Sequence, residues 1–261
     1  MNAPVMNAPV GALPSSARIF TWNIHKGIGS DRRYDLGRII DLTRRHEPDI
    51  VALQEVDSRG RDPTHLPLAA LKLALGSHAA EARTIVAEDG HYGHVLISRW
   101  PLEQVELHDV SIARREPRCA IDAVIRTPHG PFRVIATHLG LGLGERKRQI
   151  GRMVELARAA DPTQGLVMLG DFNDWHGEVR RALSSMLPAW SFLRTFPARR
   201  PIFKLDRIFC RPPGALTQCW TDSEAARASD HLPVIADLVL EALTAQDPTL
   251  SQLVTEPGIA P

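Results

Sequence analysis

Polar side chains that could bind a metal or take part in catalysis recur beside apolar segments along this chain. They are Asn23, Glu55, His138, Asp171, Asn173, Asp206, Asp230 and His231. Each is expected at the end of a strand, as Asn23 follows "IFTW" and Glu55 follows "IVALQ". A carboxylate among apolar residues must be paired, bound to a metal or protonated, because an isolated buried charge is very costly. We therefore expect these groups to share one site.

The residue types favour hydrolysis of a phosphate ester with the help of a metal. Carboxylate oxygens and the amide oxygen of Asn23 are hard ligands that suit Mg²⁺ or Mn²⁺. Two histidines, His138 and His231, can move protons near neutral pH. Asp171 and Asn173 are two residues apart, so in an extended segment their side chains would leave on the same face and enter one pocket.

Short apolar segments bounded by turn signals predict the strands that must position these groups. The predicted strands are residues 17–24, 49–56, 94–100, 120–127, 132–139, 165–172, 205–210 and 234–240. Periodic apolar residues predict helices at 34–46 and 145–160. In the second helix, Ile150 and Met153 belong to the apolar stripe, and Arg146 takes the other side. The order of elements is therefore mixed α and β.

The order of the motifs resembles that of the endonuclease/exonuclease/phosphatase superfamily, the fold of deoxyribonuclease I and exonuclease III. In chain order, the motifs are "TWNIHKG", "LQEVD", "ATHLG", "GDFND", "KLDRIF" and "SDHLPV". Each motif is weakly specific alone, but together they cover residues 17–241 in the order of the family. The resemblance implies an α/β fold, namely a four-layer α/β sandwich in which two packed mixed β-sheets are flanked by helices. It also implies a site at one edge of the sheets.

The resemblance implies a metal-binding group and a phosphate contact. Glu55 is expected to be the main Mg²⁺ ligand, with Asn23 beside it and Asp230 near the metal or its water. Arg118, in "EPRCAIDAV", resembles more loosely the family arginine that contacts the phosphate. The alternative for Arg118 is a surface salt bridge.

The resemblance also implies catalytic roles. His231, held by Asp206, would either activate the attacking water or stabilise the pentacovalent phosphate. Asp171 is the other candidate for orienting or deprotonating that water. Asn173 is expected to donate to a phosphoryl oxygen, and His138 to act on the phosphate or the leaving group.

The predicted activity is hydrolysis of a phosphodiester with Mg²⁺ or Mn²⁺ as cofactor. Abasic-site endonucleases of the superfamily carry an Asn- and Tyr-containing segment where this chain has "ATHLG". His138 therefore favours phosphodiesterases that resemble deoxyribonuclease I and sphingomyelinases, with a nucleic acid, a phospholipid head group or a small phosphodiester as substrate. The alternatives are a phosphomonoesterase of the same superfamily and a binding module that has kept the fold without catalysis. Such a module should show substitutions among the site residues, and none is seen; no stable protein partner is implied.

Composition and charge narrow the class of protein further. The net charge of +1 and the pI near 7.9 are too low for the broad positive surface of a protein that binds long nucleic acid. Three cysteines without C-x-x-C spacing argue against a disulfide framework and a zinc site. The chain shows no secretory signal and no apolar run of about 18 residues, so we expect a cytoplasmic protein without a transmembrane helix. We expect one domain, residues 17–243, between mobile tails at 1–16 and 244–261.

Overall fold

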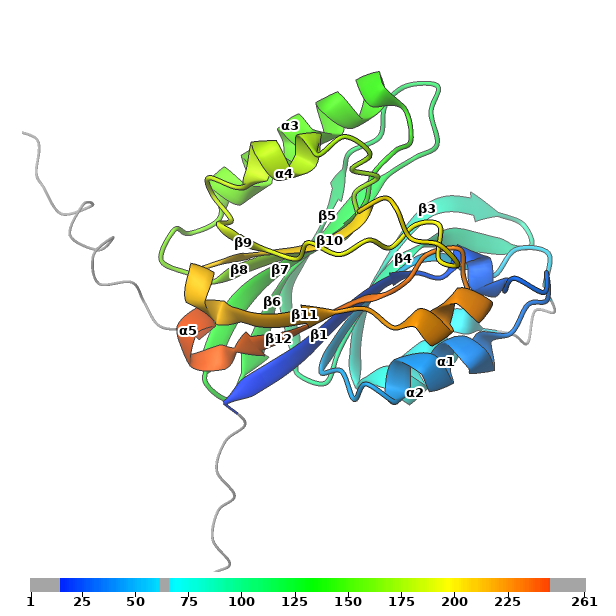
Figure 1. Cartoon of the computed structure of the whole chain (residues 1–261), viewed down its shortest axis with the longest axis horizontal. Helices are drawn as coiled ribbons and strands as arrows, with labels where there is room; N and C mark the ends of the chain where they lie inside the picture. The colour runs from blue at the N-terminus through cyan, green and yellow to red at the C-terminus, as the bar shows by residue number, and fades with distance from the viewer. Residues whose placement is uncertain (1–14, 62–65, 245–261) are drawn as a thin grey trace, which may run out of the picture.

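Two six-stranded β-sheets pack against each other in the computed structural model, which describes residues 15–61 and 66–244 (Figure 1). The first sheet has the order β11 (Leu216–Trp220), β12 (Val234–Val239), β1 (Ser16–Asn23), β2 (Ile50–Asp57), β4 (Gly90–Ser98) and β3 (His78–Ala87). The second has the order β5 (Leu102–Asp109), β6 (Cys119–Thr127), β7 (Gly130–His138), β8 (Leu166–Asp171), β10 (Asp206–Arg211) and β9 (Ala189–Trp190). Both sheets are mixed, because β1 pairs in parallel with β2 and β7 with β8, whereas the other named pairs are antiparallel.

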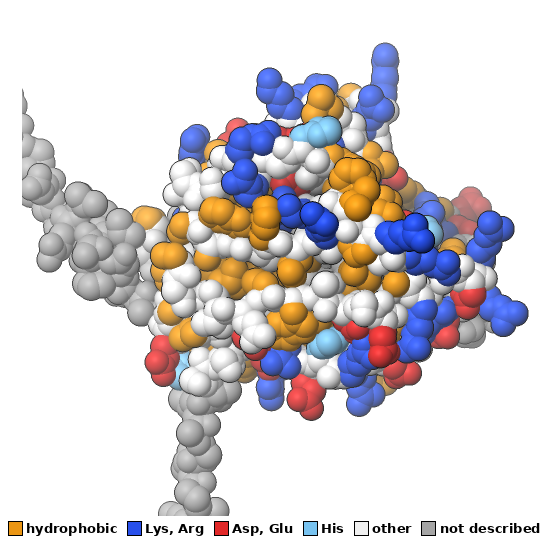
Figure 2. Space-filling view, in the orientation of Figure 1, with side chains coloured by type: hydrophobic (Ala, Val, Ile, Leu, Met, Phe, Trp, Pro, Cys, Tyr) orange, Lys and Arg blue, Asp and Glu red, His pale blue; other side chains and the backbone are white. Residues whose placement is uncertain are grey.

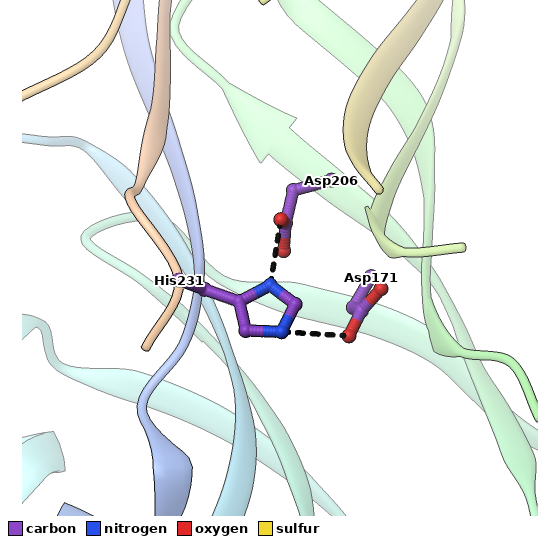
Figure 3. A group of neighbouring side chains, drawn as sticks. All are labelled: Asp171, Asp206 and His231. Carbon is purple, nitrogen blue, oxygen red and sulfur yellow. Dashed lines mark hydrogen bonds and ion pairs between the residues drawn. The ribbon is translucent and has the colours of Figure 1, made fainter. Parts of the chain in front are cut away.

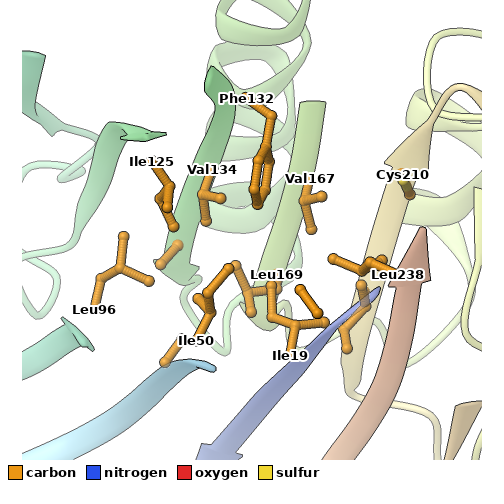
Figure 4. Close-up of a cluster of buried hydrophobic side chains, with 14 of the residues drawn as sticks. Ile19, Ile50, Leu96, Ile125, Phe132, Val134, Val167, Leu169, Cys210 and Leu238 are labelled. Carbon is orange, nitrogen blue, oxygen red and sulfur yellow. The ribbon is translucent and has the colours of Figure 1, made fainter. Parts of the chain in front are cut away.

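Alternation along the central strands places one set of side chains between the sheets and the other set under helices. Ile19 lies in the apolar cluster between the sheets, and its neighbour Phe20 lies on the outer face of the first sheet. Val167 and Met168 divide in the same way in the second sheet. This is the period of two expected for strands that are covered on both faces. Figure 4 shows the cluster between the sheets.

Helices cover the outer face of each sheet, which gives the four layers. The helices α1 (Leu36–Arg44) and α2 (Pro67–Leu75) pack on the first sheet, through residues such as Ile39 and Leu71. The helices α3 (Leu143–Ala159) and α4 (Glu178–Leu183) pack on the second, through residues such as Met153. The remaining short helices are η1 (His25–Gly27), η2 (Pro213–Ala215), η3 (Ser223–Arg227) and α5 (Leu240–Thr244). The predicted four-layer α/β sandwich is therefore confirmed.

Every strand and both helices predicted from the sequence are present, with boundaries shifted by a few residues. The prediction was incomplete, because it did not include the edge strands β3, β5, β9 and β11 or the helices α2, α4 and α5. The predicted side of Arg146 was wrong: its guanidinium is buried and ion-paired with Glu178 at 2.8 Å, because α4 packs against α3 there. The predicted tails lie almost wholly outside the described residues, and at their margins β1 begins at Ser16 and α5 ends at Thr244.

None of the helices within residues 15–61 and 66–244 is long and apolar enough to cross a membrane.

The topology brings several strand ends to one edge of the molecule. Asn23 ends β1, His138 ends β7 and Asp171 ends β8, where His138 is the register partner of Asp171. Gly170 has φ of 142°, and a Cβ there would lie 1.9 Å from the carbonyl oxygen of Thr137. Only glycine therefore allows β8 to pair closely with β7 at the residue before Asp171.

Candidate active site

One pocket of about 330 Å³ lies at this edge. Of the residues predicted for the site, those that line it are Asn23, Glu55, Arg118, His138, Asp171, Asn173, Asp230 and His231. Asp206 lies directly behind the pocket, where it contacts His231. The structure therefore brings together side chains that are more than 200 residues apart in the sequence, such as Asn23 and His231.

Asp206 and His231 form a buried pair (Figure 3). Nδ1 of His231 lies 2.8 Å from Oδ2 of Asp206, which also accepts a hydrogen bond from the Thr195 hydroxyl at 2.5 Å. Oδ1 of Asp206 has no hydrogen-bond partner among the described residues. A carboxylate on Nδ1 fixes the imidazole so that Nε2 points outward, and here Nε2 faces Oδ2 of Asp171 at 3.9 Å. That separation is too long for a direct hydrogen bond.

The charges around His231 and Asp171 move their pKa values in the same direction. Burial disfavours a charged imidazole, but Asp206 and Asp171 outweigh it and raise the pKa of His231 to about 10. Burial together with the charge of Asp206 raises the pKa of Asp171 to about 6, although His231 and Asn23 act against this shift. Both residues therefore bind a proton more tightly than Asp and His side chains usually do.

A bulge in β2 turns Glu55 toward the pocket. The pairing of β2 with β4 shifts register between Gln54 and Val56, and Glu55 has a φ of 59°. From the sequence, Glu55 is expected at the end of its strand, but β2 continues to Asp57, so the bulge and not the strand end sets the direction of the side chain. Oε1 of Glu55 accepts a hydrogen bond from the amide of Asn23 at 3.0 Å.

Asn23 connects two carboxylates of the pocket. Its Nδ2 donates to Glu55 and to Oδ2 of Asp171, each at 3.0 Å, and its Oδ1 accepts from the backbone N–H of His25. In this arrangement Asn23 positions Glu55 and Asp171 relative to each other, and its role as a metal ligand stays a prediction. The residue still lies in the predicted place.

His138 has the opposite kind of neighbour from His231. The guanidinium of Arg118 lies 3.0 Å from Nδ1 of His138 and also pairs with Glu116 at 3.0 Å. Burial, the charge of Arg118 and two nearby histidines lower the pKa of His138 well below its ordinary value. Because Arg118 can only donate, Nδ1 must accept, and the ring proton lies on Nε2. That atom is 3.5 Å from Oδ2 of Asp171, so His138 presents a neutral N–H to the pocket.

Asn173 enters the same pocket as Asp171, as predicted, but by a different backbone path. The segment was predicted to be extended, whereas β8 ends at Asp171 and Asn173 has a φ of 49°. The backbone N–H of Asn173 donates to Oδ1 of Asp171, and Nδ2 donates to the carbonyl of Leu139 at 2.8 Å. These contacts fix the amide, and its second N–H remains available to a substrate oxygen.

The donor set of the pocket fits a hard divalent cation. Glu55 and Asp230 both present carboxylate oxygens to the pocket, and the side chain of Asp230 is 45% exposed with His25 3.8 Å away. Asp171, Asp206 and His231 form a second, buried group whose potential ligand atoms lie within 4.8 Å of one another. In that group His231 and Asp206 already bond each other, which favours proton transfer over metal binding. Glu55 with Asp230 therefore remains the better candidate for the metal ligands.

Several pocket residues were not predicted from the sequence. They are Tyr92, Glu116, Leu141, Trp175, Phe196 and, behind His231, Thr195. Phe196 packs against the ring of His231, with centroids 4.9 Å apart. Glu116 and Trp175 stand within two residues of motif positions, so their place near the site could have been predicted. Thr195 and Phe196 lie in an irregular segment without a motif, and no sequence pattern predicts their place in the site.

Comparison with known proteins gives consistent matches. A sequence profile described as Endonuclease/Exonuclease/phosphatase family matches residues 20–231. A protein of Escherichia coli (strain K12), named uncharacterized protein YbhP, is 30% identical over 247 residues, which cover 86% of this chain and 97% of that protein.

Solved structures show the same fold at lower identity. An endonuclease/exonuclease/phosphatase from Beutenbergia cavernae superposes with a TM-score of 0.71 at 22% identity, over 87% of this chain and 72% of the other. TDP2 of D. rerio, humanized by 14 mutations, superposes with a TM-score of 0.66 at 16% identity, over 86% of this chain and 99% of the other.

Proposed function

The chain belongs to the endonuclease/exonuclease/phosphatase family, and on that premise we propose that it is a divalent-metal-dependent hydrolase of phosphodiesters. Members of this family are generally hydrolases that act on phosphate esters. The single observation that carries the proposal is the shared pocket: it places the Asp206–His231 pair, Asp171 and the carboxylates of Glu55 and Asp230 around one space.

The residues on the His231 side can handle the proton of an attacking water. Oδ2 of Asp171 and Nε2 of His231 are 3.9 Å apart, so one water can contact both. Asp171 can accept its proton, while His231, which holds a proton on Nε2 near neutral pH, can donate that proton to a phosphoryl oxygen. Asp206 keeps Nδ1 occupied and holds the ring in place.

The residues on the His138 side can hold the phosphate. His138 offers a neutral Nε2–H, Asn173 offers an amide N–H, and Arg118 brings a positive charge against Nδ1 of His138. Fixed donors stabilise the negative charge that develops on the phosphoryl oxygens. A divalent cation held by Glu55 and Asp230 would offset that same charge when bound.

The surroundings of the pocket favour a diester over a monoester. A hollow of about 290 Å³ adjoins it through His25 and Asp230, and another of about 310 Å³ adjoins it through Trp175. Each shares lining residues with the pocket, so a phosphate between them has room for a substituent on two sides. A monoester needs only one such space.

The proposal is tested by hydrolysis assays with a panel of substrates. The panel contains bis-p-nitrophenyl phosphate, p-nitrophenyl phosphate, an oligonucleotide and phospholipid vesicles, each with Mg²⁺ or Mn²⁺ and with EDTA. We expect metal-dependent release from the diester that exceeds release from the monoester. Faster turnover of the monoester would assign the pocket to a phosphomonoesterase, and no turnover of any member together with no binding of Mn²⁺ would reject the hydrolase.

A further inference from the structure

A positively charged loop flanks the pocket, formed by residues 191–205 between β9 and β10 and called the basic loop below. It carries Arg194, Arg199, Arg200 and Lys204 and no acidic residue. Among the described residues, none of these four cations forms an ion pair, whereas 13 of the 27 arginines of the protein do. The net charge of the whole chain is only +1, so the positive charge of the basic loop is a local feature.

The backbone holds the basic loop firmly beside the site. The N–H of Phe203 donates to the carbonyl of Phe196 at 2.8 Å, and the N–H of Thr195 donates to the carbonyl of Phe203 at 2.8 Å. Ala198 donates to the carbonyl of Asp230 at 2.7 Å, which anchors the tip of the loop to a pocket residue. The cations are therefore presented on a fixed surface next to the pocket.

Apolar side chains stand exposed among these cations. Phe192 is 62% exposed and Ile202 is 58% exposed on the basic loop, and Leu141, which lines the pocket, is 67% exposed. Figure 2 shows hydrophobic side chains gathered over the middle of this face with Lys and Arg side chains beside them. Exposed apolar groups that cluster with cations mark interaction sites more often than isolated ones do.

We infer that the basic loop and Leu141 form a face that docks on an anionic phospholipid bilayer. Unpaired Lys and Arg side chains are attracted by the negative surface of such a bilayer. Exposed aliphatic and aromatic side chains gain free energy when they enter the boundary between headgroups and acyl chains. Arg194 and Arg200 supply the first kind of contact, and Ile202 and Leu141 supply the second.

The apolar side chains suit a lipid surface better than single-stranded nucleic acid. Proteins that bind single strands stack bases on free aromatic faces. Here the ammonium of Lys204 lies 3.6 Å from the ring centroid of Phe192, and the ring of Trp175 is flanked by Phe196 and Phe203 at 5.7 and 4.8 Å. Aliphatic side chains such as Ile202 stack poorly on bases but insert readily into lipid.

Docking in this way would bring the pocket to the phosphodiester of a phospholipid headgroup. Leu141 lines the pocket, and the basic loop reaches it through Phe196. The link to headgroup hydrolysis rests on the proposed function, but the binding itself does not. Vesicle binding in EDTA, without turnover, therefore tests the face separately from the enzyme.

The experiment is co-sedimentation of the full chain with vesicles in EDTA at low salt. Vesicles of equal parts phosphatidylcholine and phosphatidylglycerol are compared with vesicles of phosphatidylcholine alone. Arg194→Ser combined with Arg200→Ser should weaken binding to the anionic vesicles about fivefold for each charge, or about 25-fold together. The matched control combines Arg44→Ser and Lys72→Ser, which remove the same charge from exposed positions on α1 and α2 and should leave binding almost unchanged.

A second variant tests the apolar contact. Ile202→Ser should weaken vesicle binding about tenfold, whereas Leu73→Ser, at a position on α2 that is 91% exposed, should not. Equal binding to both vesicle types, or equal losses in the two double variants, would overturn the proposal. Binding to a single-stranded oligonucleotide without binding to the anionic vesicles would also overturn it and would assign the face to nucleic acid.

Discussion

The two histidines of the pocket have opposite surroundings. His231 has a carboxylate at 2.8 Å from Nδ1, whereas His138 has a guanidinium at 3.0 Å from the same atom. Asp206 and Asp171 outweigh burial and raise the pKa of His231, and burial with Arg118 lowers the pKa of His138. Both rings point Nε2 toward Oδ2 of Asp171.

The difference shows how one pocket obtains two functions from the same side chain. A carboxylate on Nδ1 keeps the ring of His231 protonated, so its Nε2 is suited to giving a proton. A guanidinium on Nδ1 makes Nε2 of His138 a fixed neutral donor. The partner on the far nitrogen therefore assigns the role, and the predictions below change either the ring or its partner.

The largest effect is expected from removing the ring of His231. His231→Ala should lower kcat for a diester substrate by about 10³- to 10⁴-fold, because a proton carrier and a charge stabiliser are lost together. Steady-state kinetics on bis-p-nitrophenyl phosphate would measure it. His78→Ala, at the start of β3 and outside the pocket and both adjoining hollows, is the matched control and should keep its rate. Wild-type turnover by His231→Ala would reject the role of this histidine.

A smaller loss of kcat is expected when the ring of His231 is kept and its partner Asp206 is replaced. Asp206→Asn should lower kcat about 10²-fold with little change in KM, because an uncharged amide no longer keeps the ring of His231 protonated and oriented. The Thr195 hydroxyl can still bond the amide oxygen, so we expect the variant to fold. A rise in KM without a fall in kcat would show that Asp206 serves substrate binding instead.

The histidines kept neutral by burial should make the protein sensitive to acid. Burial lowers the pKa of His94, which lies near Arg118, from 6.5 to about 4, while an unfolded histidine protonates near 6.5. The unfolded state then binds more protons, so stability falls as the pH drops from about 6.5 toward 4, by up to about 1.4 kcal/mol per pH unit for this group. Urea unfolding without metal, across this range, would measure the slope.

His94→Leu provides the comparison for that slope. The variant removes one group that titrates only on unfolding, so its stability should depend less steeply on pH between about 6.5 and 4. His138 should still contribute a slope in the same direction, because its pKa is lowered as well. Identical slopes for the two proteins would mean that His94 is protonated in the folded state.

The smallest effect is expected from changing the partner of His138. Arg118→Met keeps the buried volume but removes the positive charge, so the pKa of His138 should rise. Titration of isotope-labelled histidine by NMR would detect it, with Arg115→Met as an exposed neighbouring control. An unchanged titration of His138 would show that burial alone keeps it neutral.

Much of the site follows from the sequence because its residues stand at the ends of apolar strands. Asn23, His138, Asp171 and Asp206 were placed by that rule, and the structure has each at a strand terminus. Glu55 was found by its motif, but its direction depends on a bulge that apolar periodicity does not reveal.

The parts of the fold and the site that were not predicted from the sequence depend on contacts between distant segments. β5 is an edge strand in which five of eight residues are polar, and a register shift between Glu103 and Glu106 interrupts the alternation that identifies a strand. Arg146 was assigned to the polar side of its helix because the sequence could not show that Glu178 would meet it. Thr195 reaches Asp206 through a loop whose path is set by pairing with Phe203 and Leu232, which no local pattern encodes.

The most direct test of the proposed function is hydrolysis of bis-p-nitrophenyl phosphate by the wild-type chain and by Glu55→Gln, each with saturating Mn²⁺ and with EDTA. We predict that EDTA abolishes wild-type turnover, that Mn²⁺ restores it, and that Glu55→Gln stays near background at every Mn²⁺ concentration. Equal turnover by the two proteins, or wild-type turnover that persists in EDTA, would contradict a metal-dependent hydrolase built around this pocket.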